Sequence, residues 1–149
     1  QFSEVAQKGL GGYNIFMNKD ELKKSLTEEE FKITQEKGTE APFKNEYSNV
    51  HDNGMYHCKV CDAPLFSSDT KFDSGTGWPS FSDAIPGSVK TQTDESHGMI
   101  RTEVVCASCG AHLGHVFDDG PTGMMESGKQ GTGKRFCTNS ASLKLYKDK

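Results

Sequence analysis

Long apolar runs are absent from this sequence, in which apolar residues of all kinds make up only 33% of 149 positions. A membrane-spanning helix needs about 20 apolar residues in succession, so we expect no membrane association. Clustered lysine and arginine are also lacking: the formal net charge is −4, and a run such as Lys134-Arg135 is too short to form a basic patch. Phosphate binding requires clustered positive charge, which argues against nucleic acid as a partner.

A secretory leader, with basic residues followed by an apolar stretch, is not found at the start of the sequence. We therefore expect an intracellular, cytoplasmic protein. A mitochondrial or other organellar location is the alternative if a targeting segment preceded Gln1 and was removed. We also expect a monomer.

Glycine and proline are plentiful by contrast, with 16 and 5 residues. This composition disfavours a helical bundle and is typical of short strands joined by turns. One helix is expected from Thr27, which forms a capping box with Glu30, to a stop near Gly38. Strands are expected at residues 55–58, 71–73, 101–105, 135–138 and 143–146.

The first part of the chain carries no chemical motif. We therefore divide the sequence into an N-terminal extension, 1–24, and a domain, 25–149. Within the domain, the glycine-rich segment 120–133 is expected to form a surface loop.

Five cysteines are present, and four of them form two C-x-x-C pairs, Cys58 with Cys61 and Cys106 with Cys109. Each pair belongs to a repeat of the form C-x-x-C-x-A-x-L, as two facing metal knuckles would. Four thiolates satisfy the tetrahedral preference of zinc and leave no open position for a substrate. Two disulfides and a cysteine-bound iron are the alternatives. The spacing favours a structural zinc site that clamps two distant segments.

The fifth cysteine, Cys137, has no such partner, and an isolated cysteine is more often inert than nucleophilic. Its neighbours favour the second role. Arg135 and Asn139 alternate with it on an expected strand, so all three side chains would share a face. A cation and an amide donor favour the thiolate, which is the reactive form. His112 and His115 are candidate acids or bases, although a hydrogen-bonded core histidine is the usual outcome.

The single tryptophan, Trp78, stands in a Gly-Trp-Pro-Ser-Phe segment, residues 77–81. Considered alone, it would be assigned to the core. The flanking glycine and proline instead indicate a rigid loop that presents the indole at a surface. An aromatic face there can hold a methyl group attached to a partly positive sulfur.

Three segments together carry a resemblance to a known family: GWPSF at 77–81, HLGHVF at 112–117 and RFCTNS at 135–140. With the two cysteine pairs, they resemble the B-type methionine sulfoxide reductases, which act on the R epimer. The resemblance extends over residues 25–146. It implies a mainly β fold of two small antiparallel sheets (β-tent or Mss4-like), with short N-terminal helices and a zinc clamp remote from the active site.

The same resemblance implies a role for each matching residue. Cys137 corresponds to the catalytic nucleophile and Trp78 to the residue that cradles the substrate methyl, with Phe136 also in substrate binding. The remaining catalytic groups correspond to His112, His115, Asn139 and Arg135, and the zinc ligands to Cys58, Cys61, Cys106 and Cys109.

The implied reaction is attack by the Cys137 thiolate on the sulfur of free or protein-bound methionine sulfoxide, with a group such as His115 protonating the oxygen. It produces methionine and a sulfenic acid on Cys137. Many family members carry a resolving cysteine where this sequence has Thr76. We therefore expect thioredoxin or a small thiol to reduce the sulfenic acid directly.

Two other functions remain open from the residues alone. A zinc-knuckle module without catalysis would bind a partner protein and would not need Cys137. A Cys–His hydrolase would need an oxyanion hole, and no segment of the sequence clearly provides one.

Overall fold

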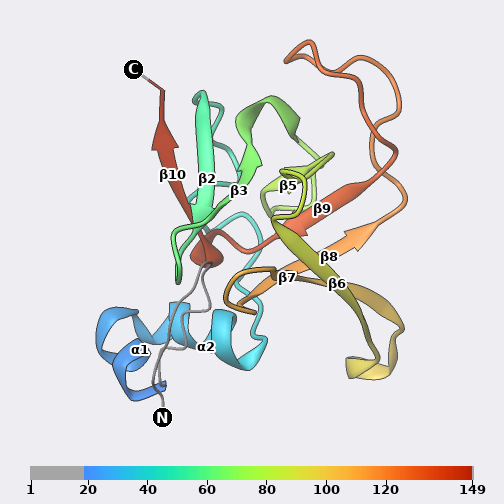
Figure 1. The fold of residues 1–149 in the computed structure, drawn as a ribbon. Coiled ribbons are helices and arrows are strands. Elements are labelled where there is room, and N and C mark those ends of the chain that lie inside the picture. The colour runs from blue at the N-terminus through green and yellow to red at the C-terminus, as the bar shows by residue number, and fades with distance from the viewer. Residues whose placement is uncertain (1–18, 149) are drawn as a thin grey trace.

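The computed structural model of this chain describes residues 19–148, apart from the side chains of Lys19 and His97. Two short helices come first, α1 (Lys19–Ser25) and α2 (Glu28–Glu36), and strands with single 3₁₀ turns follow. Both helices lie together at one end of the molecule, beneath the strands in Figure 1. None of the helices in this part of the chain is long and apolar enough to cross a bilayer.

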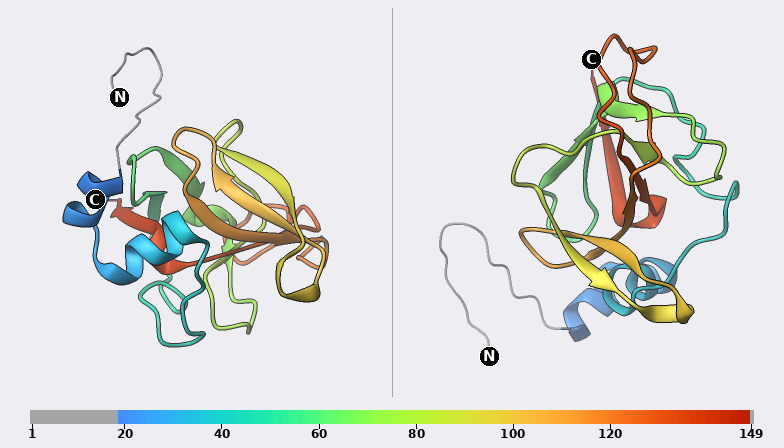
Figure 2. Two further views of the ribbon diagram at one scale, coloured as in Figure 1. Left: turned by 90° about the horizontal axis from the view of Figure 1, so that it is seen from below. Right: turned by 90° about the vertical axis from the view of Figure 1, so that its right-hand side faces the viewer.

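The strands form two antiparallel sheets, seen from three directions in Figures 1 and 2. The smaller sheet has the order β10-β2-β3, with bounds Leu143–Lys147, Gly54–Cys58 and Pro64–Ser67. The larger, six-stranded sheet has the order β4-β5-β9-β8-β7-β6, with bounds Lys71–Phe72, Ser80–Phe81, Arg135–Thr138, His112–Phe117, Arg101–Cys106 and Val89–Asp94. This architecture confirms the expected fold class.

One hydrophobic core joins the two sheets. Phe66 of the smaller sheet stacks on Phe81 of the larger sheet, with ring centroids 4.4 Å apart, and its centroid lies 5.8 Å from that of Phe136. Tyr56 meets Phe81 edge to face at 5.1 Å. Each fully buried side chain of this size contributes roughly 1.5–3 kcal/mol. These contacts fix how one sheet sits on the other.

The helix predicted from the capping box is confirmed as α2. The Thr27 hydroxyl accepts a hydrogen bond from the Glu30 backbone N–H at 3.1 Å, and the Glu30 carboxylate accepts one from the Thr27 N–H at 3.0 Å. The helix ends at Lys37, which adopts a left-handed conformation with φ 58°. This end of α2 has a direct part in the site described below.

All five predicted strands are present, as β2, β4, β7, β9 and β10. Four further strands have weak sequence signals: β3 begins with a proline, β5 has two residues, β6 is mostly exposed and polar, and β8 contains a glycine and two histidines. Helix α1 also has no signal in the sequence and overlaps the segment 1–24. The division of the chain after residue 24 stays a prediction.

The segment 120–133 contains no helix or strand beyond an isolated bridge between Met124 and Gln130. It projects at the end of the molecule opposite the helices (Figures 1 and 2). Met124 is 69% exposed. The predicted surface loop is therefore confirmed.

Candidate active site

A row of polar side chains crosses the larger sheet. Cys137 in β9 lies directly opposite His115 in β8 on one side and Ser80 in β5 on the other. His115 in turn lies opposite Glu103 in β7, and Glu103 lies opposite Gln92 in β6. Residues paired directly across antiparallel strands point to the same face of a sheet. Five strands thus bring these side chains to one face.

The two histidines reach this face because β8 contains a bulge. Residues three apart on a regular strand point to opposite faces. In this sheet, however, Val104 pairs with Gly114 whereas the next residue, Val105, pairs with His112. The extra residue in β8 turns His112 to the face of His115, and the centroids of the two rings lie 5.5 Å apart.

A cleft of about 110 Å³ opens beside this polar face. Four residues predicted for the site line it: Trp78, His115, Cys137 and Asn139. A cavity of about 150 Å³ accepts a benzene molecule, so the cleft has room for a group of a few heavy atoms. The other lining residues, which the sequence did not single out, are Thr39, Arg101, Gly114, Phe117 and Thr138.

Phe136, expected to bind the substrate, lies on the other face of β9. It is 7% exposed and packs against Phe66 in the core. It is not among the residues that line the cleft. Successive residues on a strand point to opposite faces, so the position of Cys137 at the cleft turns Phe136 away from it.

Two opposing effects act on the half-buried thiol of Cys137. Burial is the larger one and raises the pKa of Cys137 above its usual value of 9.0. The positive charge of Arg135 and hydrogen bonds with Thr76 and Arg135 act to lower it. Arg135 therefore favours the thiolate, as expected, but does not overcome burial.

The Arg135 guanidinium is fixed on two sides. Its Nε and Nη2 donate to the Asp119 carboxylate at 2.9 and 3.2 Å, and its Cζ lies 4.4 Å from the ring centroid of Phe117. An arginine restrained in this way keeps its charge in one place and loses little side-chain freedom on binding. Its charge is therefore held near the Cys137 sulfur.

Each histidine hydrogen-bonds one carboxylate. His115 Nε2 lies 2.7 Å from Asp94 Oδ2, and His112 Nδ1 lies 2.7 Å from Glu103 Oε2. The bond from His115 is the main cause of the lowered pKa of Asp94. Burial acts to raise the pKa of Glu103, but the hydrogen bonds it accepts outweigh burial and lower it. Because ionised carboxylates only accept, the bonded nitrogen of each ring carries a proton.

The two histidines differ in access. His112 is 3% exposed, does not line the cleft, and has its pKa lowered chiefly by burial. His115 lines the cleft next to Cys137. Sequence reasoning left the choice between them open, and of the two only His115 is in a position to meet a ligand.

The carboxylates that hold the histidines are residues that sequence reasoning missed. Lys37 at the end of α2 lies with its Nζ 3.1 Å from Glu103 Oε1 and 4.0 Å from Asp94 Oδ1. Gln92 donates to Glu103 Oε1 at 2.9 Å, and Arg101 Nη2 lies 3.6 Å from Asp94 Oδ2. The available sequence signal was Glu103, an acidic residue directly before two valines on a predicted strand. A carboxylate buried in such a strand needs a hydrogen-bonding or charged partner.

Asn139 lies one residue beyond the end of β9 rather than on the strand. Its side-chain Oδ1 accepts from the Glu40 backbone N–H at 3.1 Å, and its Nδ2 donates to the Leu113 carbonyl at 3.2 Å. The amide is 3% exposed and firmly held. Its backbone is still extended, with φ −89° and ψ 132°, so its side chain reaches the same cleft as that of Cys137, two residues earlier, as the expected alternation predicts.

Trp78 is half-buried at the rim of the cleft. Its indole N–H donates to the backbone carbonyl of Glu40 at 2.9 Å. Gly77 before it has φ +90°, and a Cβ there would lie 2.7 Å from atoms of Phe43 and Pro42. The loop can follow this path because residue 77 has no side chain.

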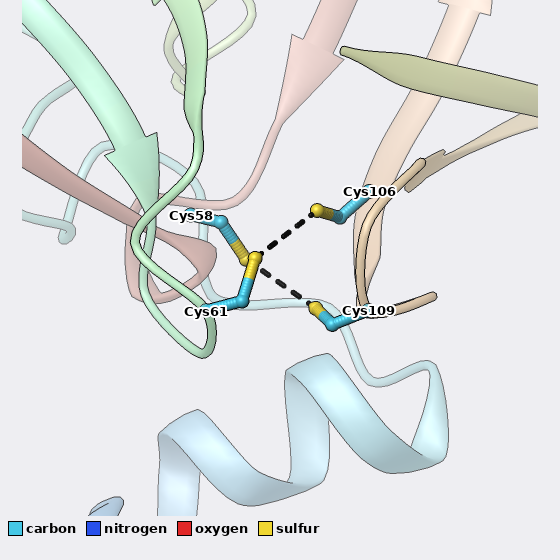
Figure 3. Close-up of side chains that lie close together, drawn as sticks. All are labelled: Cys58, Cys61, Cys106 and Cys109. Carbon is cyan, nitrogen blue, oxygen red and sulfur yellow. Dashed lines mark hydrogen bonds between the residues drawn. The ribbon is translucent and has the colours of Figure 1, made fainter. Parts of the chain in front are cut away.

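The four other cysteines form a separate cluster (Figure 3). Cys58 Sγ lies 3.7 Å from Cys109 Sγ, Cys61 Sγ lies 3.5 Å from Cys106 Sγ, and all four sulfurs lie within 4.8 Å of one another. A tetrahedral ion with metal–sulfur bonds of about 2.3 Å would hold the sulfurs about 3.8 Å apart. The cluster could therefore hold one metal ion, and none of its residues lines the cleft.

Disulfides do not account for this cluster. A disulfide requires two sulfurs about 2.05 Å apart. All five cysteines lie in the described part of the chain, and each is free. The two shortest contacts also run between the C-x-x-C pairs and not within them.

Comparison with known proteins gives a consistent result. A family model described as the SelR domain matches residues 26–147. The chain is 53% identical over 140 residues to peptide methionine sulfoxide reductase B1, chloroplastic, of Oryza sativa subsp. japonica, covering 93% of this chain and 62% of that protein. It is 52% identical over 130 residues to methionine-R-sulfoxide reductase B3, mitochondrial, of Mus musculus, covering 87% and 48%.

A bacterial relative matches over almost its whole length. The chain is 48% identical over 137 residues to peptide methionine sulfoxide reductase MsrB of Leptospira interrogans serogroup Icterohaemorrhagiae serovar Lai (strain 56601), covering 91% of this chain and 98% of that protein. By contrast, the chain spans only about half to two thirds of the plant and mouse proteins. Among solved structures, the Mis18 'Yippee-like' domain aligns with a TM-score of 0.49 and 18% identity, covering 65% of this chain and 98% of that chain.

Replacing Glu103 with glutamine should destabilise the protein, since Lys37 and His112 lose the charge they face. We expect the free energy of unfolding at neutral pH to fall by about 3 kcal/mol, the range for breaking one side of a buried charged group. The pKa of Glu103 is lowered in the folded protein, so its carboxylate stabilises the fold above the usual value of 4.5 and loses this effect as the pH falls below it.

Denaturant unfolding of the wild type, Glu103→Gln and the exposed control Glu95→Gln tests this at neutral pH and below pH 4.5. The difference in the free energy of unfolding between wild type and Glu103→Gln should become smaller below pH 4.5. Glu95→Gln should have the stability of the wild type at both pH values. An equal difference in unfolding free energy at both pH values would contradict a stabilising role for the charge of Glu103.

Proposed function

This chain belongs to the SelR-domain family of peptide methionine sulfoxide reductases, and on that basis we propose that it reduces the R epimer of methionine sulfoxide. One observation carries the proposal: Cys137 and His115 lie opposite each other on paired strands, at a cleft whose rim is formed by Trp78. A nucleophile, a proton donor and an aromatic surface are the three groups that the reaction requires.

Substrate binding begins at Trp78. The sulfur of a sulfoxide carries partial positive charge, so its methyl group is attracted to the face of the indole. The sulfoxide oxygen then faces His115 of β8. Because the Nε2 of this ring is hydrogen-bonded to Asp94, its Nδ1 is the nitrogen that contacts the substrate. The Asn139 amide has a second N–H beyond the one bonded to Leu113, and lies at the same cleft.

In the chemical step, the Cys137 thiol loses its proton as the sulfoxide oxygen gains one through His115. The sulfur then attacks as a thiolate, with Arg135 stabilising its charge. The oxygen passes from the substrate sulfur to the Cys137 sulfur, which gives methionine and a sulfenic acid. The substrate is reduced by two electrons and Cys137 is oxidised by two, so this half-reaction needs no further reductant.

Replacing Cys137 with serine should abolish reduction of R-sulfoxide while leaving the fold intact, because a hydroxyl cannot take the oxygen in this way. The measurement is reduction of the R and S epimers of a blocked methionine sulfoxide with dithiothreitol, with thermal unfolding as the control for folding. Reduction of the S epimer at the R rate, or retained activity in Cys137→Ser, would contradict the proposal. The second result would favour the non-catalytic binding module.

Zinc is the metal that we propose for the four-cysteine cluster. Four thiolates at these distances suit a closed tetrahedral site, and such sites contribute directly to folding stability. Cys58 ends β2 of the smaller sheet and Cys61 follows it, whereas Cys106 ends β7 of the larger sheet and Cys109 follows it. The ion would therefore tie the sheets together and take no part in the reaction.

We expect one zinc ion per chain by elemental analysis. Cys109→Ser should lose the metal and unfold at a lower temperature, and a strong chelator should destabilise the wild type similarly. Cys137→Ser is the matched control and should retain a full equivalent of zinc. Iron in place of zinc, or full stability of the wild type without metal, would contradict this assignment.

The sulfenic acid on Cys137 is reduced directly by thioredoxin or a small thiol. Thr76 occupies the position where many family members have a resolving cysteine, and it lies close enough to Cys137 to lower the pKa of its thiol. The other four cysteines form the metal cluster. Within residues 19–148, no resolving thiol is therefore available near Cys137. Two thiols of the reductant would restore Cys137 with release of water and formation of their own disulfide.

After one equivalent of substrate without reductant, mass spectrometry of the wild type should find one added oxygen on Cys137 and no disulfide. Thr76→Cys should instead form a disulfide with Cys137, because residue 76 lies near the Cys137 sulfur. The double variant Thr76→Cys/Cys137→Ser is the control and should form none. A disulfide between Cys137 and a cluster cysteine in the wild type would overturn direct reduction.

The names of the plant and mouse relatives refer to the chloroplast and the mitochondrion. They support the organellar alternative over the cytoplasmic location first expected. The substrates we propose are oxidised proteins and free methionine sulfoxide, and the acting form is a monomer.

A further inference from the structure

The segment that connects α2 to β2 passes directly beside the candidate active site. We call residues 39–47 the connecting segment. Within it, Glu40 is 6% exposed. A carboxylate is costly to bury unless it gains strong hydrogen bonds, so its position calls for an explanation.

The backbone of Glu40 holds the side chains of two cleft residues. Its carbonyl accepts the indole N–H of Trp78 at 2.9 Å, and its N–H donates to Oδ1 of Asn139 at 3.1 Å. Trp78 and Asn139 both line the cleft beside Cys137. One peptide segment therefore fixes an aromatic and an amide side chain that come from separate loops.

The side chain of Glu40 fixes the turn that follows the nucleophile. Its carboxylate accepts hydrogen bonds from the backbone N–H groups of Ser140 and Ala141, the latter at 2.9 Å. In residues 19–148, no basic side chain forms an ion pair with it. Its charge is satisfied by the backbone of this turn.

Neighbouring residues of the connecting segment strengthen both attachments. Phe43 N–H and the Asn45 side chain each donate to the Gly77 carbonyl at 2.8 Å. The Ser140 hydroxyl donates to Asn45 Oδ1 at 2.7 Å and accepts from the Tyr47 N–H at 3.0 Å. The segment thus joins the Trp78 loop to the turn after Cys137, and Glu40 alone bonds the side chains of both cleft residues.

Activation of the nucleophile does not explain this carboxylate. The negative charge of Glu40 contributes to raising the pKa of Cys137, which disfavours the thiolate. Burial also raises the pKa of Glu40 itself, against the effect of its hydrogen bonds. Because Glu40 disfavours ionisation of Cys137, its role is better explained by the positions of the residues that it hydrogen-bonds.

From this geometry we propose that Glu40 is a positioning residue, which holds the Trp78 indole and the Asn139 amide in place across the cleft from Cys137. It acts through these two side chains and does not touch the substrate. The kinetic consequences rest on the proposed function, whereas the structural consequence for Trp78 does not.

The single tryptophan provides a direct readout, since all tryptophan emission comes from Trp78. Glu40→Ala leaves two buried N–H groups without an acceptor, and Glu40→Gln retains an acceptor for one of them. We expect emission shifted to longer wavelength and stronger quenching by acrylamide in Glu40→Ala, with Glu40→Gln intermediate. Glu46→Ala, an exposed glutamate of the same segment, is the matched control and should match the wild type.

Steady-state reduction of R-sulfoxide provides the second readout. Loss of the Trp78 position removes binding that is similar in the ground and transition states, so KM should rise. We expect about a tenfold increase in KM for Glu40→Ala, which corresponds to a loss of about 1.4 kcal/mol of substrate binding. The value of kcat should fall less, because Cys137 and His115 are held by the β8–β9 pairing.

The proposal would be overturned if a folded Glu40→Ala had the emission, quenching and KM of the wild type. A fall in kcat with no change in KM would also overturn it. If Glu40→Ala does not fold, Glu40→Gln decides by the same measurements. Loss of cooperative unfolding in both variants would assign Glu40 a general structural role and overturn positioning. A wild type without reductase activity would refute the proposed function, and the emission and quenching of the variants would still decide the role of Glu40.

Discussion

The register between β8 and β9 is the constraint on which the site depends. It pairs Cys137 with His115 and sends both side chains to one face. A slip of one residue would turn Cys137 into the core and Phe136 toward the cleft. Gly114 helps to exclude other arrangements, because a Cβ there would lie 2.0 Å from the Cys137 carbonyl oxygen. The close approach of these two backbones requires a residue without a side chain.

The larger sheet has two faces with separate functions. One packs Phe81, Val104 and Phe136 into the core shared with the smaller sheet. The other carries the carboxylates, histidines and thiol, and Lys37 at the end of α2 lies against two of those acids. The cysteine cluster joins the sheets at a third place. Stability and chemistry therefore use different surfaces of the same strands.

Much of this arrangement was predictable from local sequence. Two C-x-x-C pairs predict the four-cysteine cluster by spacing alone, and the capping box at Thr27 predicts the start of α2. Glu40, Asp94 and Glu103 could not be found in this way, because their importance comes from partners distant in sequence. The bulge in β8 was equally hidden, since it is visible only in the pairing with β7. The burial that raises the pKa of Cys137 was also hidden, because neighbouring charge is evident in a sequence and burial is not.

The raised pKa of Cys137 affects how readily oxidants attack its sulfur. Peroxides and other oxidants react with thiolates far faster than with thiols. Burial disfavours the thiolate and so makes this sulfur a poorer target for them. The desolvation that opposes ionisation of Cys137 thus also shields its sulfur from oxidation.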